Sequence, residues 1–197
     1  RKIILSTSPG PTPVEQVSHI SNNANMWRTV NDFWDNWRDL KEQFDVCSRW
    51  AEAGVQYGYP DADMLPLGKI GIRAERGQPR MSRFTKDEQV ALMTLFAIFR
   101  SPLMFGGDLP SNDGFTLSLI TNPGVLYVHR NSINGNQIFR ENDKIVWSAD
   151  DPATGDKFVA LFNVYDPPRE TGGREAGSAV SSVPETADIT VDFELLG

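Results

Sequence analysis

Two stretches of the chain repeat apolar residues at the spacing of a helix. The first predicts a helix from about Trp34 to Ala53-Gly54, where the glycine is typical of a helix end. Residues 90–99 are apolar nearly all round, which predicts a second, buried helix, and Thr85 and Glu88 ahead of it form a capping box. The first stretch has its apolar residues at steps of four and three, on one helix face: Phe33, Trp37, Leu40, Phe44 and Cys47.

Short apolar runs between the helical stretches predict parallel strands. Residues 2–6 contain a run of consecutive apolar residues, which is typical of a strand covered on both faces. Residues 25–30 predict a second buried strand. The prolines of residues 8–13 predict a rigid turn between them, followed by a short helix over residues 14–22 with Val17 and Ile20 facing inward. Further strands before Asp61 and from Leu103 bring the count to four βα units, and residues 115–121 predict one more short helix.

After Asn122-Pro-Gly124 the pattern changes to short β-branched or aromatic runs separated by polar turns. This texture predicts an antiparallel β region, with a boundary near residue 130. Residues 169–186 are rich in Gly, Ser and Glu and predict a mobile hairpin loop. The predicted strands are residues 125–129, 137–140, 144–148, 158–165 and 189–195.

Composition narrows the function classes. A chain of 197 residues with 40% hydrophobic content can bury a core. A formal charge of −7 without a Lys/Arg cluster argues against a nucleic-acid or anionic-membrane partner and favours a neutral or cationic ligand. There is no apolar run of about twenty residues, as a membrane-spanning helix requires. Cys47 is the single cysteine, so we expect a packed core thiol, no internal disulfide and no cysteine metal site.

Asp32 is the first candidate for chemistry, because it follows a predicted strand where a helix begins. One interpretation is structural: Asp at such a junction is a common N-cap. The other is catalytic. Trp27, Phe33 and Trp34 could surround the carboxyl group with apolar surface, which raises the pKa of an aspartic acid and suits a general acid.

A second acidic group lies at Asp61 and Asp63. On an extended segment two residues apart point the same way, so two parallel carboxylates would suit a metal or a polyhydroxylated ligand. The alternative is that either acid binds the backbone of its own loop. Residues 69–83 are basic and contain glycine, which predicts a surface loop, and Asp108 lies in a further loop at a strand end.

Three motifs together resemble glycoside hydrolase family 27, the α-galactosidase and α-N-acetylgalactosaminidase family. They are Trp27-Arg28 followed by Asp32 and Trp37, then Asp61-x-Asp63-Met-Leu65, then Ser101-Pro-Leu-x-x-Gly-x-Asp-Leu109. The resemblance covers residues 1–130 well and the β region loosely. It implies the second half of a (β/α)8 barrel, strands five to eight, over residues 1–130. An incomplete antiparallel β domain is implied over residues 131–197.

The resemblance also implies roles for individual residues. Asp32 falls on the general acid/base of a retaining mechanism, and Arg28 on the arginine of the same motif. Asp63 falls on an acid that holds sugar hydroxyls, with Met64 beside it. The remaining implied contacts to substrate are Ser8, Trp27 and Tyr59. Ser8 stands where the family carries Glu or Ser beside the sugar C2 group, which favours a bulkier C2 substituent. No cofactor is implied.

The family's nucleophile lies in a Lys-x-Asp sequence at the end of the fourth strand, and this chain begins after that point. Retaining chemistry requires two carboxyl groups roughly 5 Å apart. We therefore expect a partial chain, inactive without the remaining half of the barrel. The implied substrate is a glycoside with terminal α-linked galactose or N-acetylgalactosamine. The alternative is a non-catalytic carbohydrate-binding protein.

Two further expectations rest on analogy with the family. Thr7 and Ala24 stand where many eukaryotic members have paired cysteines, which indicates a bacterial-type member. Such relatives commonly work outside the cytoplasm, so a secreted or periplasmic location is favoured. No feature of the sequence indicates an oligomeric state.

Overall fold

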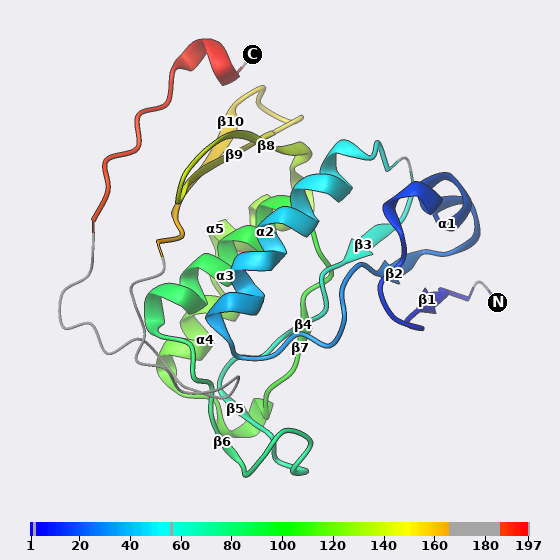
Figure 1. Cartoon of the computed structure of the whole chain (residues 1–197), viewed down its shortest axis with the longest axis vertical. Coiled ribbons are helices and arrows are strands. Elements are labelled where there is room, and N and C mark those ends of the chain that lie inside the picture. The colour runs from blue at the N-terminus through cyan, green and yellow to red at the C-terminus, as the bar shows by residue number, and fades with distance from the viewer. Residues whose placement is uncertain (2, 56, 166–185, 197) are drawn as a thin grey trace.

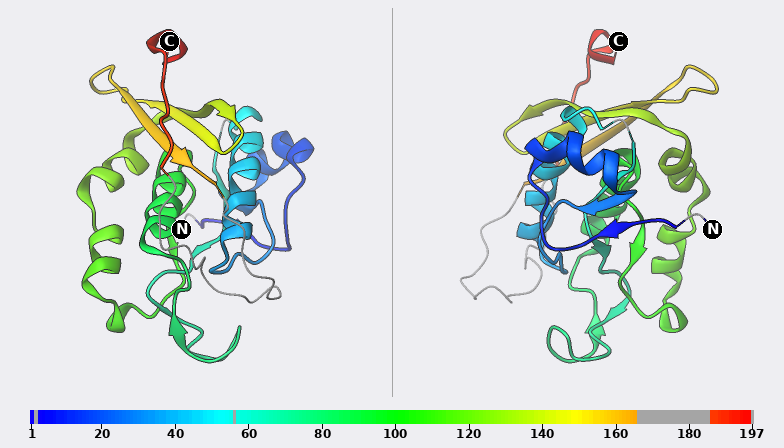
Figure 2. Two further views of the ribbon diagram at one scale, coloured as in Figure 1. Left: turned by 60° about the vertical axis from the view of Figure 1, so that its left-hand side comes forward. Right: turned by 90° about the vertical axis from the view of Figure 1, so that its right-hand side faces the viewer.

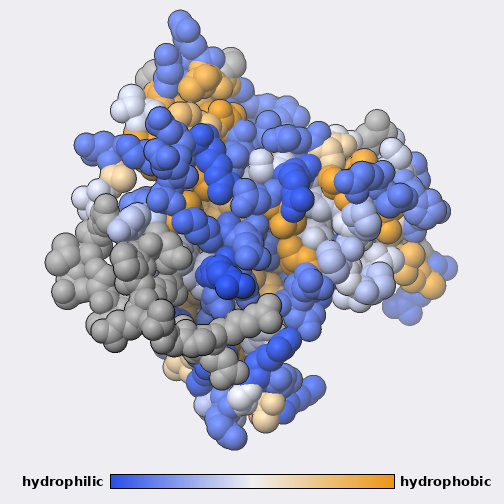
Figure 3. Space-filling view, viewed as in Figure 1, coloured by the Kyte–Doolittle hydropathy of each residue, from blue (hydrophilic) through white to orange (hydrophobic). Residues whose placement is uncertain are grey.

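The computed structural model describes residues 1, 3–55, 57–165 and 186–196. Short parallel strands, helices and an antiparallel sheet together form a mixed α/β structure (Figure 1). Helices α2 (Trp37–Glu52) and α3 (Lys86–Phe99) contact each other, and the antiparallel sheet lies across both (Figures 1 and 2). The face seen in Figure 3 is mostly hydrophilic, with apolar residues in separate small patches.

Three short parallel strands form the first sheet, in the order β1 (Ser6–Thr7), β2 (Met26–Arg28) and β3 (Tyr59–Asp61). The connection from β1 to β2 runs through the predicted proline turn, η1 (Val14–Gln16) and α1 (Val17–Asn23). The connection from β2 to β3 runs through α2. In the register of the strands, Arg28 lies opposite Asp61, so their carboxyl ends meet at one edge.

A second parallel pair continues this arrangement. Strand β4 (Met64–Leu65) pairs with β7 (Met104–Phe105), and α3 connects them. Only two residues separate β3 from β4, so the parallel strands follow one another as β1, β2, β3 with β4, and β7. The predicted surface loop of residues 69–83 contains a small antiparallel hairpin, β5 (Lys69–Ile70) and β6 (Arg80–Met81).

Helix α2 confirms the predicted apolar face and corrects the predicted start. Leu40, Phe44 and Cys47 are fully buried. The helix begins at Trp37 because the side chain of Asn36 accepts a hydrogen bond from the Arg38 N–H and so caps it. Burial raises the pKa of the Cys47 thiol, as desolvation disfavours the thiolate, so this residue is the packed core thiol that was expected.

Helix α3 begins with the predicted capping box. The Glu88 N–H donates to Thr85 Oγ1 at 3.2 Å, and the Thr85 N–H donates to Glu88 Oε2 at 2.8 Å. The helix ends at Arg100, which has a left-handed φ of 63° without being glycine. Its guanidinium donates to the carbonyls of His129 and Ser132 at 3.1 and 2.8 Å, which fixes this turn against the C-terminal end of α5 (Pro123–Asn131).

After β7, the structure has a helix where the sequence predicted the first strand of the antiparallel region. Elements η2 (Leu109–Ser111) and α4 (Gly114–Ile120) are followed by α5 (Pro123–Asn131). The predicted strand over residues 125–129 is therefore wrong. The Asn122 side chain accepts from the N–H groups of Gly124 and Val125, and Pro123 occupies the first turn, so a helix start outweighs the β-branched residues.

The antiparallel sheet has the order β10, β9, β8, and its strands are β8 (Ile133–Glu141), β9 (Lys144–Asp150) and β10 (Lys157–Asn163). These strands confirm three of the predicted runs. The predicted strand over residues 189–195 is wrong, since this segment is extended chain followed by η3 (Phe193–Leu196), and no strand pairs with it in the described ranges. Nearly all of the predicted loop over residues 169–186 lies outside the described residues.

The first strand is shorter and more exposed than predicted. Only Ser6 and Thr7 pair, and they pair with β2 alone among the strands that the structure describes. Ile3 is 83% exposed and Ile4 is 74% exposed, so the expectation of a strand covered on both faces is wrong for these residues. They form an uncovered apolar edge beside β1.

A single apolar cluster connects the helices to both kinds of sheet. It reaches from Trp27 and Trp50 through α2 and α3 to Trp147 and Phe162. Within the described ranges, no helix is long and apolar enough to cross a membrane. The same part of the chain gathers no set of His, Cys, Asp or Glu side chains that could hold a metal ion.

Candidate active site

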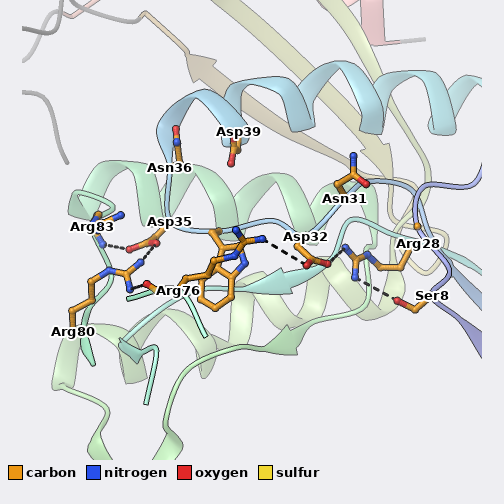
Figure 4. A pocket seen from close by; sticks show the side chains of 12 residues that line it. Ser8, Arg28, Asn31, Asp32, Asp35, Asn36, Asp39, Arg76, Arg80 and Arg83 are labelled. Carbon is orange, nitrogen blue, oxygen red and sulfur yellow. Dashed lines mark hydrogen bonds and ion pairs between the residues drawn. The ribbon is translucent and has the colours of Figure 1, made fainter. Parts of the chain in front are cut away.

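An open cavity of about 550 Å³ lies beyond the carboxyl ends of β1 and β2 (Figure 4). This is the edge at which open parallel sheets and α/β barrels place their ligands. Three segments supply its walls: the loop after β1, the loop after β2 as far as the first turn of α2, and the β5–β6 hairpin with the residues after it. The lining residues are Ser8, Gly10, Arg28, Asn31, Asp32, Trp34, Asp35, Asn36, Asp39, Arg76, Arg80 and Arg83.

Arg28, the last residue of β2, connects the side chains on one side of the cavity. Its Nη2 lies 3.0 Å from Asp63 Oδ2 and 3.4 Å from Asp32 Oδ1, and it donates to the Val30 carbonyl at 3.2 Å. Its Nη1 lies 3.4 Å from Ser8 Oγ. The strand end thus fixes a guanidinium, two carboxylates and a hydroxyl within one hydrogen-bonding network.

Asp63 enters this network through an unusual backbone conformation. Its φ is +77°, and the Asp61 carboxylate stabilises this turn by accepting the Asp63 N–H at 2.9 Å. Asp63 Oδ2 accepts the Phe33 N–H at 2.6 Å in addition to the contact with Arg28. The segment is therefore not extended, and the expectation of two parallel carboxylates is wrong, whereas the alternative of backbone binding is confirmed for Asp61.

Asp61 itself is a structural group in a buried environment. Burial raises the pKa of its carboxyl group, and the hydrogen bond from the Asp63 N–H opposes that rise. Its main-chain carbonyl accepts hydrogen bonds from both the N–H and the hydroxyl of Thr29, at 2.9 and 3.0 Å. These contacts connect the ends of β2 and β3 and so hold Arg28 and Asp63 at a common edge.

Asp32 projects into the cavity and is 69% exposed. Its two carboxylate oxygens lie 3.4 Å from Arg28 and 3.9 Å from Arg76. It does not cap α2, because Asn36 does, so the helix-cap interpretation is wrong. The expected apolar enclosure is also wrong, since only Trp34 among the three candidate aromatics lines the cavity.

Four residues that the resemblance placed at the substrate do not line this cavity. Asp63 is one of them, although it contacts the lining residue Arg28, and the other three lie elsewhere. Trp27 is fully buried against Trp50, with ring centroids 5.8 Å apart, because its side chain lies on the opposite face of β2 from Arg28. Tyr59 begins β3 and therefore lies at the amino end of the strand, where the Arg100 guanidinium is 5.8 Å from its ring. Met64 lies in β4, against Gly106.

The structure adds an ion pair that sequence reasoning did not find. Asp35 is almost completely buried; its Oδ1 accepts from Arg80 Nη2 at 2.6 Å and its Oδ2 accepts the Arg83 N–H at 2.8 Å. This pair anchors the β5–β6 hairpin to the loop after β2. Arg80 Nη1 also donates to the Arg76 carbonyl at 2.8 Å, which shapes the loop that presents Arg76. The available signal was the density of arginine in residues 73–83.

The arrangement combines an exposed carboxyl group with a recessed network that can accept and donate hydrogen bonds. Asp32 is accessible to a ligand, whereas Asp63 and Arg28 are mostly buried and fixed in position. A polyhydroxylated ring could therefore be oriented by Arg28, Asp63 and Ser8 while a proton passes to or from Asp32.

Several known proteins are similar to this chain in sequence and in fold. A family model described as alpha galactosidase A matches residues 7–131. Alpha-galactosidase 2 of Arabidopsis thaliana is 32% identical over 127 residues, which are 64% of this chain and 29% of that protein. A β-L-arabinopyranosidase of glycoside hydrolase family 27 from Geobacillus stearothermophilus has a solved structure that is 53% identical, with a TM-score of 0.77 over 81% of this chain and 37% of its own.

A second solved structure is similar to this chain at lower identity. It is a proposed α-N-acetylgalactosaminidase from Bacillus halodurans, 44% identical with a TM-score of 0.69, and it is matched over 84% of this chain and 37% of its own. The chain thus spans about a third of the length of the proteins it matches.

Proposed function

Because the chain belongs to glycoside hydrolase family 27, we propose that it supplies the acid/base side of a retaining glycosidase site. The single observation that carries this proposal is the position of Asp32. Its carboxyl group is exposed in the cavity beyond the carboxyl ends of the strands, beside the network of Arg28 and Asp63. An exposed acid can reach a glycosidic oxygen, and a retaining mechanism uses it first to protonate the leaving group and then to activate water.

The neighbouring residues take binding roles in this proposal. Arg28 and Asp63 hold ring hydroxyls of the terminal sugar, because their charged donors and acceptors are fixed by each other at 3.0 Å. Ser8 lies beside Arg28 Nη1 and faces the sugar C2 substituent. Trp27, Tyr59 and Met64 support the fold around the site and do not contact the sugar.

The proposed substrates are glycosides whose terminal sugar has the galactose configuration. The named activities of relatives support this class: an α-galactosidase, a proposed α-N-acetylgalactosaminidase and a β-L-arabinopyranosidase. A β-L-arabinopyranoside has the ring configuration of an α-D-galactoside and lacks its C6 hydroxymethyl group. The higher identity to the arabinopyranosidase favours a site that accepts this smaller sugar alongside α-galactosides.

The arrangement of strands supports the second half of a (β/α)8 barrel. We propose that β1, β2, β3 with β4, and β7 are strands five to eight, that residues 1–130 are this half-barrel, and that residues 131–197 belong to a β domain. The nucleophile then comes from the other half. Asp35 is almost completely buried, and Asp63 is mostly buried against Arg28 and the Phe33 N–H, so neither is placed to act as that nucleophile.

The test compares Asp32→Asn with the parent protein in the complete gene product. The substrates are 4-nitrophenyl α-galactoside, α-N-acetylgalactosaminide and β-L-arabinopyranoside, together with an unactivated disaccharide of the preferred sugar. Loss of the general acid should lower kcat/KM on the disaccharide by about 10²- to 10⁴-fold and on the activated aryl glycoside by much less. The thermal midpoint should hardly change, since exposed ion pairs contribute little to stability.

Asp108→Asn is the matched control, because Asp108 is also an acid in a strand-end loop and binds Ser111, away from the cavity. It should leave all four rates unchanged. An Asp32→Asn protein that hydrolyses the disaccharide at the parent rate would show that Asp32 is not the acid.

A carbohydrate-binding protein without turnover is the second candidate. The observation that favours it is the burial of Asp35 and Asp63, because neither of these described residues then offers Asp32 an accessible carboxyl partner across the cavity. Under this alternative, calorimetry detects galactose or arabinose binding in a complete protein that hydrolyses none of the four substrates.

A further inference from the structure

The cavity continues past Asp32, away from the residues proposed to hold the terminal sugar. Figure 4 shows Arg28 and Ser8 on one side of Asp32 and Arg76, Arg80 and Arg83 on the other. If Asp32 protonates the glycosidic oxygen, the terminal sugar lies on the Arg28 side and the leaving group lies on the arginine-rich side. This assignment rests on the proposed function, and it makes the β5–β6 hairpin a wall of the leaving-group subsite.

Arg76 is the accessible cation of this wall. Its side chain is 59% exposed, and its contact with Asp32 is long, at 3.9 Å. An exposed ion pair of this kind contributes little free energy, so a ligand anion can take the place of the Asp32 carboxylate beside Arg76 at small cost. The Arg76 guanidinium also lies 5.9 Å from the centre of the Trp34 ring, which gives the subsite an aromatic surface next to a charge.

Arg80 has a different role, because its charge is already balanced. It is bound by the buried carboxylate of Asp35, and the same carboxylate accepts the Arg83 N–H. The pair therefore fixes the two segments that carry Arg76 and Arg83 without using either of their guanidinium groups. Asp39 lines the same half of the cavity, so the wall is basic but not purely so.

The charge of this wall contrasts with that of the chain. The formal net charge of the chain is −7, yet all four cationic residues that line the cavity are arginines, and three of them lie beyond Asp32. Arginine binds carboxylates in a planar, bidentate geometry that lysine does not offer. We propose that the leaving-group subsite selects an acidic sugar, whose carboxylate binds Arg76 with support from Arg83 while its ring lies against Trp34.

The experiment uses paired aryl glycosides of whichever sugar the complete protein hydrolyses. One probe carries a 4-carboxyphenyl leaving group and the other a neutral 4-carbamoylphenyl leaving group of similar size. The measured quantity is the ratio of their kcat/KM values, corrected for the leaving-group pKa. The carboxylate probe should be preferred by about fivefold, the scale of one exposed charge-assisted hydrogen bond. Arg76→Gln should bring the ratio close to one, and added salt should reduce it.

Arg73→Gln is the matched control, since it removes an arginine from the same loop that does not line the cavity, and it should keep the parent ratio. Arg83→Gln should lower the ratio less than Arg76→Gln. A parent ratio of one, or a preference that survives Arg76→Gln, would overturn the subsite while leaving the glycosidase proposal intact. Failure of the complete protein to hydrolyse either probe and the simple aryl glycosides would instead overturn the proposed function.

Discussion

Two antiparallel hairpins of this protein, β5–β6 and β8–β9, are held in place by opposite means. The β5–β6 hairpin has two residues in each strand and is attached to the site by the buried pair of Asp35 and Arg80. The β8–β9 hairpin has long strands whose Ile145, Val146 and Trp147 are fully buried in the core. A polar anchor fixes orientation around a few atoms and leaves the loop exposed, whereas apolar burial stabilises the whole domain. The first kind therefore suits a wall of a binding site.

The largest expected effect comes from breaking the apolar hairpin. Trp147 is fully buried and packs edge-on against Phe99, with ring centroids 6.1 Å apart. Trp147→Ala should lower the free energy of unfolding by about 3–5 kcal/mol, because a large cavity remains. Chemical denaturation measures this change. Trp147→Phe keeps most of the ring, and the indole N–H has no hydrogen-bond partner among the described residues, so its loss should be clearly smaller. Equal losses of unfolding free energy in Trp147→Ala and Trp147→Phe would show that the packing of this ring is not the source of the stability.

Breaking the polar anchor should give an intermediate loss of stability and a localised loss of function. Asp35→Ala leaves Arg80 without its partner and removes the acceptor of the Arg83 N–H, at a cost of about 2 kcal/mol. The preference for a carboxylate leaving group should also disappear. Arg80→Met added to Asp35→Ala should cost little more, because the two residues act as one pair. Additive losses in this double-mutant cycle would contradict a single anchor.

The smallest effect is expected from the polar contacts of the larger hairpin. Lys41 Nζ in α2 lies 2.8 Å from Asp143 Oδ1 in the β8–β9 turn, and both side chains are partly exposed. Lys41→Met should change the free energy of unfolding by less than about 1 kcal/mol, since solvent and salt screen such pairs. Thermal melts at low and high salt provide the measurement. A loss as large as that of Asp35→Ala would remove the contrast between the two hairpins.

The local parts of the fold could be predicted from the sequence because their causes are local. The apolar face of α2 depends on spacing, and the start of α3 depends on two residues that cap each other. The strand predicted at residues 125–129 was wrong for an equally local reason: Asn122 and Pro123 start a helix, and β-branched residues within one turn do not prevent it.

The residues of the candidate site could be predicted from the sequence only in part. Arg28 ends β2, and Ser8 and Asp32 lie in the loops after β1 and β2, so topology places all three at the carboxyl edge. The hairpin wall was missed because Asp35 and Arg80 are 45 residues apart, and no periodicity connects them. Tyr59 shows the opposite case, since an aromatic residue next to an acidic motif can still begin its strand and so lie at the far end.

The left-handed backbone of Asp63 makes it possible to distinguish selection for stability from selection for turnover at this position. Glycine or asparagine would suit a φ of +77° at least as well as aspartate does, so the backbone conformation by itself gives no reason for a carboxylate at this position. The reason lies in the contacts of the carboxylate with Arg28 and with the Phe33 N–H. Asn keeps both the left-handed turn and an acceptor oxygen, so a library screened only for thermostability should accept Asn at position 63, whereas one screened for turnover should return Asp. The residue found at position 63 would therefore indicate whether a given screen has selected for stability or for turnover.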